Sequence, residues 1–259
     1  MSSGYGGYGS KSTPKWGFHP QGLKARTPSA AQHLKALTKA EFPSLVEDLL
    51  KRRKEVFARI KAGQNLGSFL ISANLSVVVF GAVYGATMGA YPGGLHVLYN
   101  VLKIPLLLLI SLYVSLPTYY VLDAFSGGEV SFTQVASVLL SSFSIMATVL
   151  LAFVPVNLFF ILTTPNSNFQ TYAFVVLLNV TIFAVAGLAG LLYLGAGMES
   201  IHSSRKWVNG FFIGLLVQIF VGTQLAWVLR PYFDGGVFLR PLEGNFYIAI
   251  FKLLARVFG

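Results

Sequence analysis

The sequence has 259 residues, of which 54% are hydrophobic and only 11% are charged, and its mean hydropathy is +0.66. A soluble domain of this length cannot hide so much apolar surface from water, so the composition predicts an integral membrane protein and excludes a soluble one. The chain contains no cysteine, which excludes disulfides, thiolate metal sites, cysteine nucleophiles and palmitoylation.

The net charge of +10 is concentrated near the amino terminus, where residues 1–61 hold twelve of the nineteen Lys and Arg residues but only four of the nine acids. A basic segment directly before a first membrane span marks the cytoplasmic side and attracts anionic lipid. We therefore expect a cytoplasmic amino terminus that meets anionic lipid. No nucleic-acid-binding motif accompanies the charge, so no nucleic-acid partner is predicted.

The amino-terminal region divides into two parts. Residues 1–42 form a basic arm rich in Gly, Tyr and Pro, without apolar periodicity, which we expect to be unfolded on its own. Residues 43–62 predict an amphipathic juxtamembrane helix, because apolar residues recur at near-helical spacing and opposite charges lie four residues apart. Two roles stay open for this helix: it docks on a partner or on the lipid surface, or it merely anchors the chain at the interface. The apolar stripe is Leu45, Val46, Leu49, Leu50, Val56, Phe57 and Ile60, and the charge pairs are Glu47 with Lys51, Asp48 with Arg52, and Glu55 with Arg59.

Residues 63–229 predict a transmembrane domain of about five helical spans. Only four Lys, Arg, Asp or Glu residues occur between residues 63 and 204, and breaks in hydrophobicity separate stretches long enough to cross about 30 Å of hydrocarbon. The expected spans are residues 67–90, 98–122, 132–163, 171–194 and 208–229. The third is over-long, and Pro155 is expected to kink it or to begin a separate turn. The predicted fold is an all-α, polytopic transmembrane helix bundle with amphipathic helices at both ends.

The first span has a glycine-lined face, on which Gly81, Gly85 and Gly89 recur every four residues. A helix face without side chains admits another helix at close range, and we expect this face to pack on a neighbouring span of the same chain, the alternative being a subunit interface. Lys103, in the second span, is expected to extend to the headgroups, the alternative being a polar pathway.

No catalytic constellation can be assembled from the sequence, so we expect a protein that is not an enzyme. The polar groups expected within the spans, Asn74, Asn157, Asn179 and Gln218, each predict one interhelical hydrogen bond. No cofactor or metal site is predicted. Axial ligation of haem or a chlorin by His96 or His202 is disfavoured, because both lie near span ends and ligating histidines usually lie deeper in a bundle.

The tail, residues 230–259, combines an interfacial elbow with a second amphipathic helix. Its basic residues fit poorly with a carboxyl terminus on the outer side, which an odd number of spans requires when the amino terminus is inside. We expect the tail to lie on the membrane surface or on a partner. The residues predicted to make these contacts are Trp227, Arg230, Tyr232, Arg240, Phe246, Lys252 and Arg256.

Several stretches carry a resemblance to a known family. KIPLLLLISLYVSLPTYYVLDAF, AFVPVNLFF, and LRPYF followed by EGNFY, within residues 65–250, resemble a group of uncharacterised bacterial five-span membrane proteins whose span layout is similar to that of the Yip-type family. The short acidic and Tyr-Gly-Pro signature of the Yip-type family is absent before the first span, so the resemblance implies a fold and no reaction.

Three functions follow from these features. The leading hypothesis is a non-catalytic accessory or scaffold subunit of a larger membrane complex, with an energy-converting complex as one host, because the first span is glycine-lined and intramembrane charge is scarce. The second is a membrane-organising protein of the Yip type that recruits a soluble partner. The third is a transporter of small solutes or lipids.

Overall fold

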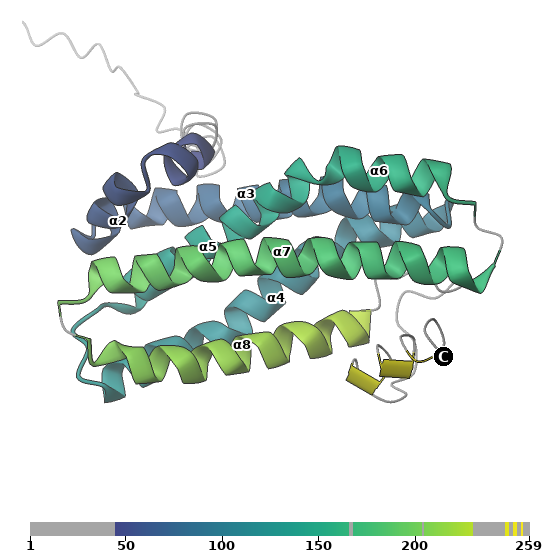
Figure 1. Ribbon diagram of the computed structural model, residues 1–259. Helices are drawn as coiled ribbons and strands as arrows, with labels where there is room; N and C mark the ends of the chain where they lie inside the picture. Colours follow the sequence, from purple (N-terminus) through teal and green to yellow (C-terminus); the bar gives the residue numbers. More distant parts are fainter. Residues whose placement is uncertain are drawn as a thin grey trace, which may run out of the picture.

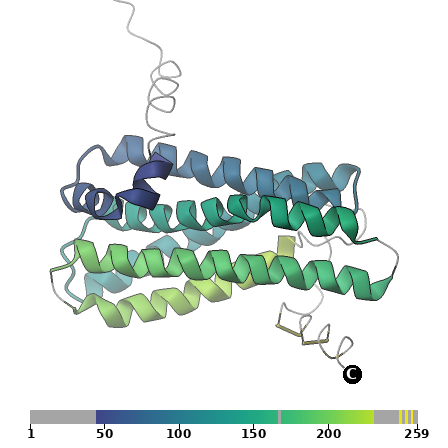
Figure 2. The ribbon, with the colours of Figure 1, turned by 45° about the horizontal axis from the view of Figure 1, so that its top comes forward.

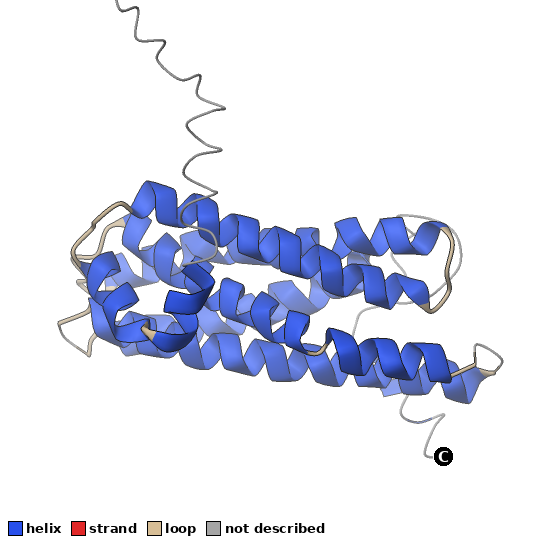
Figure 3. Ribbon diagram, turned by 90° about the horizontal axis from the view of Figure 1, so that it is seen from above, coloured by secondary structure: helices blue, strands red, loops and turns tan. Residues whose placement is uncertain are grey.

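The computed structural model describes residues 45–165, 168–203, 205–229, 247–248, 251–252 and 255. All regular structure among these residues is helical, which confirms the predicted all-α class (Figure 3). After a helical stretch at residues 45–51, the helices are α2 (Arg53–Lys61), α3 (Leu66–Ala90), α4 (Leu95–Phe125), α5 (Phe132–Ala152), α6 (Val154–Thr163), α7 (Phe169–Ile201) and α8 (Trp207–Leu229) (Figure 1). Five of them, α3, α4, α5, α7 and α8, are long and apolar enough to cross a membrane.

The spans lie where the hydropathy pattern predicts them, with two differences in extent. Helix α4 extends three residues beyond the predicted span at each end and runs through both Pro105 and Pro117, and α7 extends seven residues beyond the predicted end. The over-long third span is divided into α5 and α6 at Phe153, and Pro155 lies in the first turn of α6, where its missing N–H costs no hydrogen bond. The predicted effect of Pro155 is therefore confirmed as a break between two helices.

The five long helices run roughly along one axis, and α2 lies across one end of the bundle (Figure 2). Helices α3, α4 and α5 form the centre, with α7 packed along α5 and α8 packed along α4. Helix α5 is the most buried of the five and α8 the least buried. The two outermost helices, α7 and α8, therefore have different supporting helices although a short turn joins them.

The glycine face of α3 packs on α4 of the same chain, as predicted. A Cβ built on Gly85 would lie 2.2 Å from the backbone oxygen of Asn100, and one on Gly89 would lie 2.4 Å from Cα of Val97. At Gly81 the nearest atoms, from Pro105 and Leu108, are 3.5 Å away, which is ordinary van der Waals contact. The α3 and α4 backbones thus approach most closely near their shared turn.

Hydrogen bonds between polar side chains join separate helices of the bundle, which confirms the prediction for the three asparagines. Tyr113 in α4 donates to Asn74 in α3 (2.7 Å), and Tyr84 in α3 donates to Asn179 in α7 (2.8 Å). Asn157 in α6 donates to Thr87 in α3 (3.1 Å). Such bonds satisfy groups that hydrocarbon cannot solvate, and they fix which helix faces meet.

The predicted amphipathic segment is helical but is interrupted at Arg52. The apolar side chains Val56, Phe57 and Ile60 of α2 are buried, and α2 packs on α5 and α7. The ring of Phe57 lies 4.9 Å from that of Tyr193, centroid to centroid, and Gly197 makes room for it. The predicted charge pairs Lys51 to Glu47 (3.1 Å) and Arg52 to Asp48 (3.9 Å) are present. Helix α2 is therefore part of the bundle, while Leu50 and the charged side chains of residues 51–55 stay exposed.

The expectation for Lys103 is wrong. The residue is only 6% exposed and lies within the α4 packing surface, whereas a lysine that reaches the headgroups must extend along the outside of its helix. Hydropathy placed it near a span boundary but carried no information on which side of α4 it occupies.

Candidate functional site

A groove with a volume of about 520 Å³, here called the α7/α8 groove, lies between α7 and α8. Its walls are α7 and α8 and its floor is α4 and α5. Leu188 and Ile219 are exposed at its rim, so the groove opens toward the outside of the bundle. It exists because α7 and α8 pack on different neighbours and scarcely touch each other along their length. The residues lining the two walls include Val180, Phe183, Ala184, Gly187, Gly190, Gln218, Gly222, Thr223 and Ala226.

Small residues on both walls give the α7/α8 groove its width. Ala184 and Gly187 line the α7 side, and Gly222 and Ala226 line the α8 side. A Cβ built on Gly187 would meet no heavy atom within 4 Å, so this position opens directly into free space.

The polar groups of the α7/α8 groove are few and uncharged. Ser111, Ser142, Gln218 and Thr223 are among its lining residues. Ser142 already donates to the backbone oxygen of Gly190 (2.8 Å), and Thr223 bonds within its own helix. The Oε1 atom of Gln218 is buried without a hydrogen-bond partner among the described residues, so the predicted interhelical bond of Gln218 is not formed there. This composition suits an uncharged, largely apolar guest with one polar group.

A second, polar pocket of about 380 Å³, here called the end pocket, lies at the end of the bundle that carries α2. It is enclosed by the last residue of α2, the α4–α5 turn and the α7–α8 turn. The charged residues among its lining are Lys61, Glu129 and Lys206, and His202 and Trp207 form its wall on the α7–α8 side.

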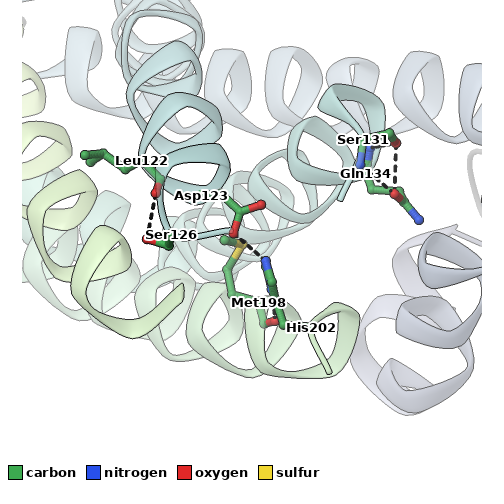
Figure 4. A network of polar contacts seen from close by, with 7 residues as sticks. All are labelled: Leu122, Asp123, Ser126, Ser131, Gln134, Met198 and His202. Atoms are coloured by element: carbon green, nitrogen blue, oxygen red, sulfur yellow. Dashed lines mark hydrogen bonds and ion pairs between the residues drawn. The ribbon is translucent and has the colours of Figure 1, made fainter. Parts of the chain in front are cut away.

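The wall of the end pocket is tied together by Asp123 and His202 (Figure 4). Nε2 of His202 lies 2.5 Å from Oδ1 of Asp123, and Nδ1 lies 2.7 Å from the backbone oxygen of Met198. The two side chains are 2% and 5% exposed, Asp123 and His202 respectively. Trp207 stacks on the imidazole with a centroid distance of 5.6 Å and an interplanar angle of 24°. The pair thus joins the end of α4 to the turn between α7 and α8.

Gln134 makes the corresponding link between α2 and α5, and Figure 4 shows its contacts with Ser131 at the start of α5. Its Oε1 accepts from the backbone N–H of Ser131 (2.8 Å), while the Ser131 hydroxyl accepts from the backbone N–H of Gln134 (3.3 Å), which together form a capping box at the start of α5. Its Nε2 donates to the carbonyl of Lys61 (2.8 Å) at the end of α2. One amide therefore caps α5 and holds the end of α2.

The sequence-predicted histidines lie at opposite ends of the bundle. His96 is half-buried beside the turn before α4, with Nδ1 3.2 Å from the backbone oxygen of Gly93. Both ring nitrogens of His202 are already engaged, so axial ligation by His202 would require breaking one of these contacts. Within the described ranges, no three His, Asp or Glu residues are grouped so that they could hold a metal ion. The acidic companion of His202 is separated from it by 79 residues, and no spacing in the sequence signals it.

The predicted tail contacts fall largely outside the described residues. Arg230, Tyr232, Arg240, Phe246 and Arg256 all lie there. Trp227 is in the last two turns of α8, and Lys252 is helical and exposed. The tail contacts α8 through Tyr247, whose hydroxyl lies 2.9 Å from that of Thr223.

The charged face of the amphipathic segment is exposed and basic. Lys51, Arg52, Arg53 and Lys54 are all exposed at the α2 end of the bundle. A hydrogen bond from Lys51, with its positive charge, lowers the pKa of Glu47, so this acid stays ionised and offsets one of the charges.

Comparison with family models, with curated proteins and with solved structures finds no match for this chain.

Proposed function

We propose that this protein is a non-catalytic accessory or scaffold subunit of a larger membrane complex, and that it holds a partner's transmembrane helix in the α7/α8 groove. The observation that carries this proposal is the combination of small residues on both walls with the buried amide of Gln218. Small residues let helix backbones approach, and amides form interhelical hydrogen bonds, so both features are typical of helix interfaces in membranes.

The charge distribution supports a cytoplasmic position for the α2 end. The exposed basic residues Lys51 to Lys54, with Arg205 and Lys206, lie at this end, whereas residues 91–94 and 164–168 at the other end carry no charged side chain. Cytoplasmic loops carry the excess of Lys and Arg, and basic segments near the membrane attract anionic lipid. The same exposed basic face is the feature that the Yip-type hypothesis would use to recruit a soluble partner.

A lipid-binding role is the second candidate, and the volume and composition of the α7/α8 groove favour it. Ligand pockets commonly have volumes of about 300–1,000 Å³, a mainly apolar lining and a few polar groups, and the α7/α8 groove fits this description. An acyl chain entering from the bilayer would pass the exposed Leu188 and Ile219.

The two candidates predict different products in a crosslinking experiment. A photo-reactive amino acid in place of Leu188, at the rim of the α7/α8 groove, should give one discrete protein adduct in native membranes. Gly187→Leu adds a side chain that fills the groove without a backbone clash, and it should remove most of that adduct. Mass spectrometry of the crosslinked product then identifies the guest.

Gly67→Leu is the matched control for this experiment. Gly67 lies in α3, and a Cβ there also meets no heavy atom within 4 Å, but Gly67 is not part of the groove. The control variant should keep the protein adduct. An adduct of lipid mass that disappears with Gly187→Leu would replace the subunit proposal with the lipid-binding one, and any adduct that survives Gly187→Leu unchanged would contradict both.

A further inference from the structure

The contacts of the His202 ring determine how many protons the corner of α4, α7 and α8 holds. Nδ1 faces a carbonyl oxygen and Nε2 faces a carboxylate oxygen, and both of these oxygens are acceptors. A neutral imidazole has one N–H donor and one nitrogen with a lone pair. Beside an ionised Asp123, the lone pair of that nitrogen would therefore face the lone pair of an acceptor oxygen in one of the two contacts. One additional proton removes this conflict. It gives either an imidazolium beside a carboxylate or an imidazole that accepts from a carboxylic acid.

The surroundings of the pair agree with a retained proton. Trp207 lies face to face with the ring at 5.6 Å, a geometry that favours a cationic imidazole. The Oδ2 atom of Asp123 is buried without a hydrogen-bond partner among the described residues, and Gly128 leaves the space it occupies. A buried carboxylate with only one satisfied oxygen is costly, so a proton shared through the other oxygen lowers that cost.

Charged groups from each neighbouring element face the same pocket. They are Lys61 from α2, Glu129 from the α4–α5 turn and Lys206 from the α7–α8 turn, while Glu199 of α7 and Arg205 are exposed outside the lining. His202 is itself part of the pocket wall, so the pair borders the end pocket.

We propose that Asp123 and His202 form a proton-binding site, and that the bound proton holds the α7–α8 turn against α4. Since α7 and α8 diverge from this turn to form the α7/α8 groove, loss of the proton at alkaline pH should let the two helices move relative to each other. The effect on the groove rests on the proposed function, whereas the proton site does not.

The proton is tested directly by nitrogen-15 NMR of the full chain with labelled histidine, reconstituted in nanodiscs. The His202 signal is assigned as the one that His202→Gln removes. At neutral pH both ring nitrogens of His202 should be protonated, or Nδ1 alone if the proton lies on Asp123, and the signal should shift as the pH is raised. A ring signal that does not move across the pH range in which the protein stays folded would overturn the site.

Asp123→Asn is the matched variant, because its amide can donate to Nε2 while Nδ1–H donates to Met198, so every contact is satisfied without an additional proton. The thermal midpoint of the natural chain should fall by several degrees as the pH rises, because the folded state binds a proton that the unfolded state has released. Asp123→Asn should flatten this part of the profile. Equal pH profiles for both proteins would overturn the proposal, even where Asp123→Asn lowers stability overall.

Movement of the helices has its own readout. The chain has no cysteine, so spin labels at Leu192→Cys and Leu216→Cys, both 68% exposed, report the separation of α7 and α8 without background. The distance distribution should broaden or shift at alkaline pH, and Asp123→Asn should prevent the change. A pH-dependent NMR signal with an unchanged distance would overturn the effect on the groove and uphold the proton site. Failure of the partner crosslink would instead count against the proposed function alone.

Discussion

Gly85→Ala should lower the thermal midpoint of the protein by several degrees, although it adds a single methyl group. The new Cβ would lie 2.2 Å from the backbone oxygen of Asn100, so no side chain can move aside and α3 must shift away from α4. Overpacking of a close-packed interior costs about 1–3 kcal/mol, and more where backbone must move. In a chain of this size each kcal/mol corresponds to about 2–4 °C in the midpoint. Thermal unfolding in detergent, followed by size-exclusion chromatography, measures the shift.

Gly81→Ala provides the matched control for this prediction, because it lies one helical turn away on the same face. Its Cβ would lie 3.5 Å from Pro105 and Leu108, a normal contact distance, and alanine is the better helix former. This variant should leave the midpoint unchanged or raise it slightly. Equal midpoints for Gly85→Ala and Gly81→Ala would contradict the α3–α4 packing described for the structure.

Features that depend on one helix at a time were predictable from the sequence. The five spans follow from hydropathy, because hydrocarbon forces the backbone to satisfy its hydrogen bonds within a helix of the required length. The glycine face of α3 and the hydrogen bonds of Asn74 and Asn179 were predicted for a related reason. A helix face without side chains, or a side-chain amide within a span, is expected to contact another span. This expectation does not depend on which span provides the contact.

Features that depend on which helices adjoin were not predictable. The amphipathic pattern of residues 43–62 identifies an apolar face, but the same pattern suits a membrane surface and a bundle, and the structure shows that α5 and α7 cover it. The burial of Lys103 escaped prediction because hydropathy does not show which side of α4 packs on the rest of the bundle.

The candidate site was missed for the same reason. The α7/α8 groove arises from a choice of neighbours, α5 for α7 and α4 for α8, and hydropathy does not encode this choice. Asp123 and His202 lie near two different turns, and no motif in the sequence links the two residues. Only the packing of α7 and α8 on the central helices brings the carboxylate and the imidazole together.

Phe57→Ala should detach α2 from the bundle and produce the largest loss of stability of any variant considered. Phe57 is 3% exposed, its ring packs on Tyr193, and Gly197 lies against its edge. Truncation of a buried phenylalanine costs about 3–5 kcal/mol, and the remaining cavity would lie between α2 and α7. The basic residues at 51–54 would then lose their fixed position relative to the five spans. The two contacts that Gln134 makes with the end of α2 would also be lost.

Two measurements on Phe57→Ala separate detachment of α2 from general unfolding. Trypsin should cleave the variant within residues 51–61 at temperatures at which the natural chain is protected, while the five spans stay intact on the gel. Leu50→Ala is the control, because Leu50 belongs to the same segment but is 57% exposed, and it should change neither the midpoint nor the cleavage pattern. If both variants were cleaved equally, the buried ring of Phe57 would not be what holds α2 on the bundle. The contacts of Gln134 with the backbone oxygens of Ile60 and Lys61 would then be the remaining link between α5 and the end of α2.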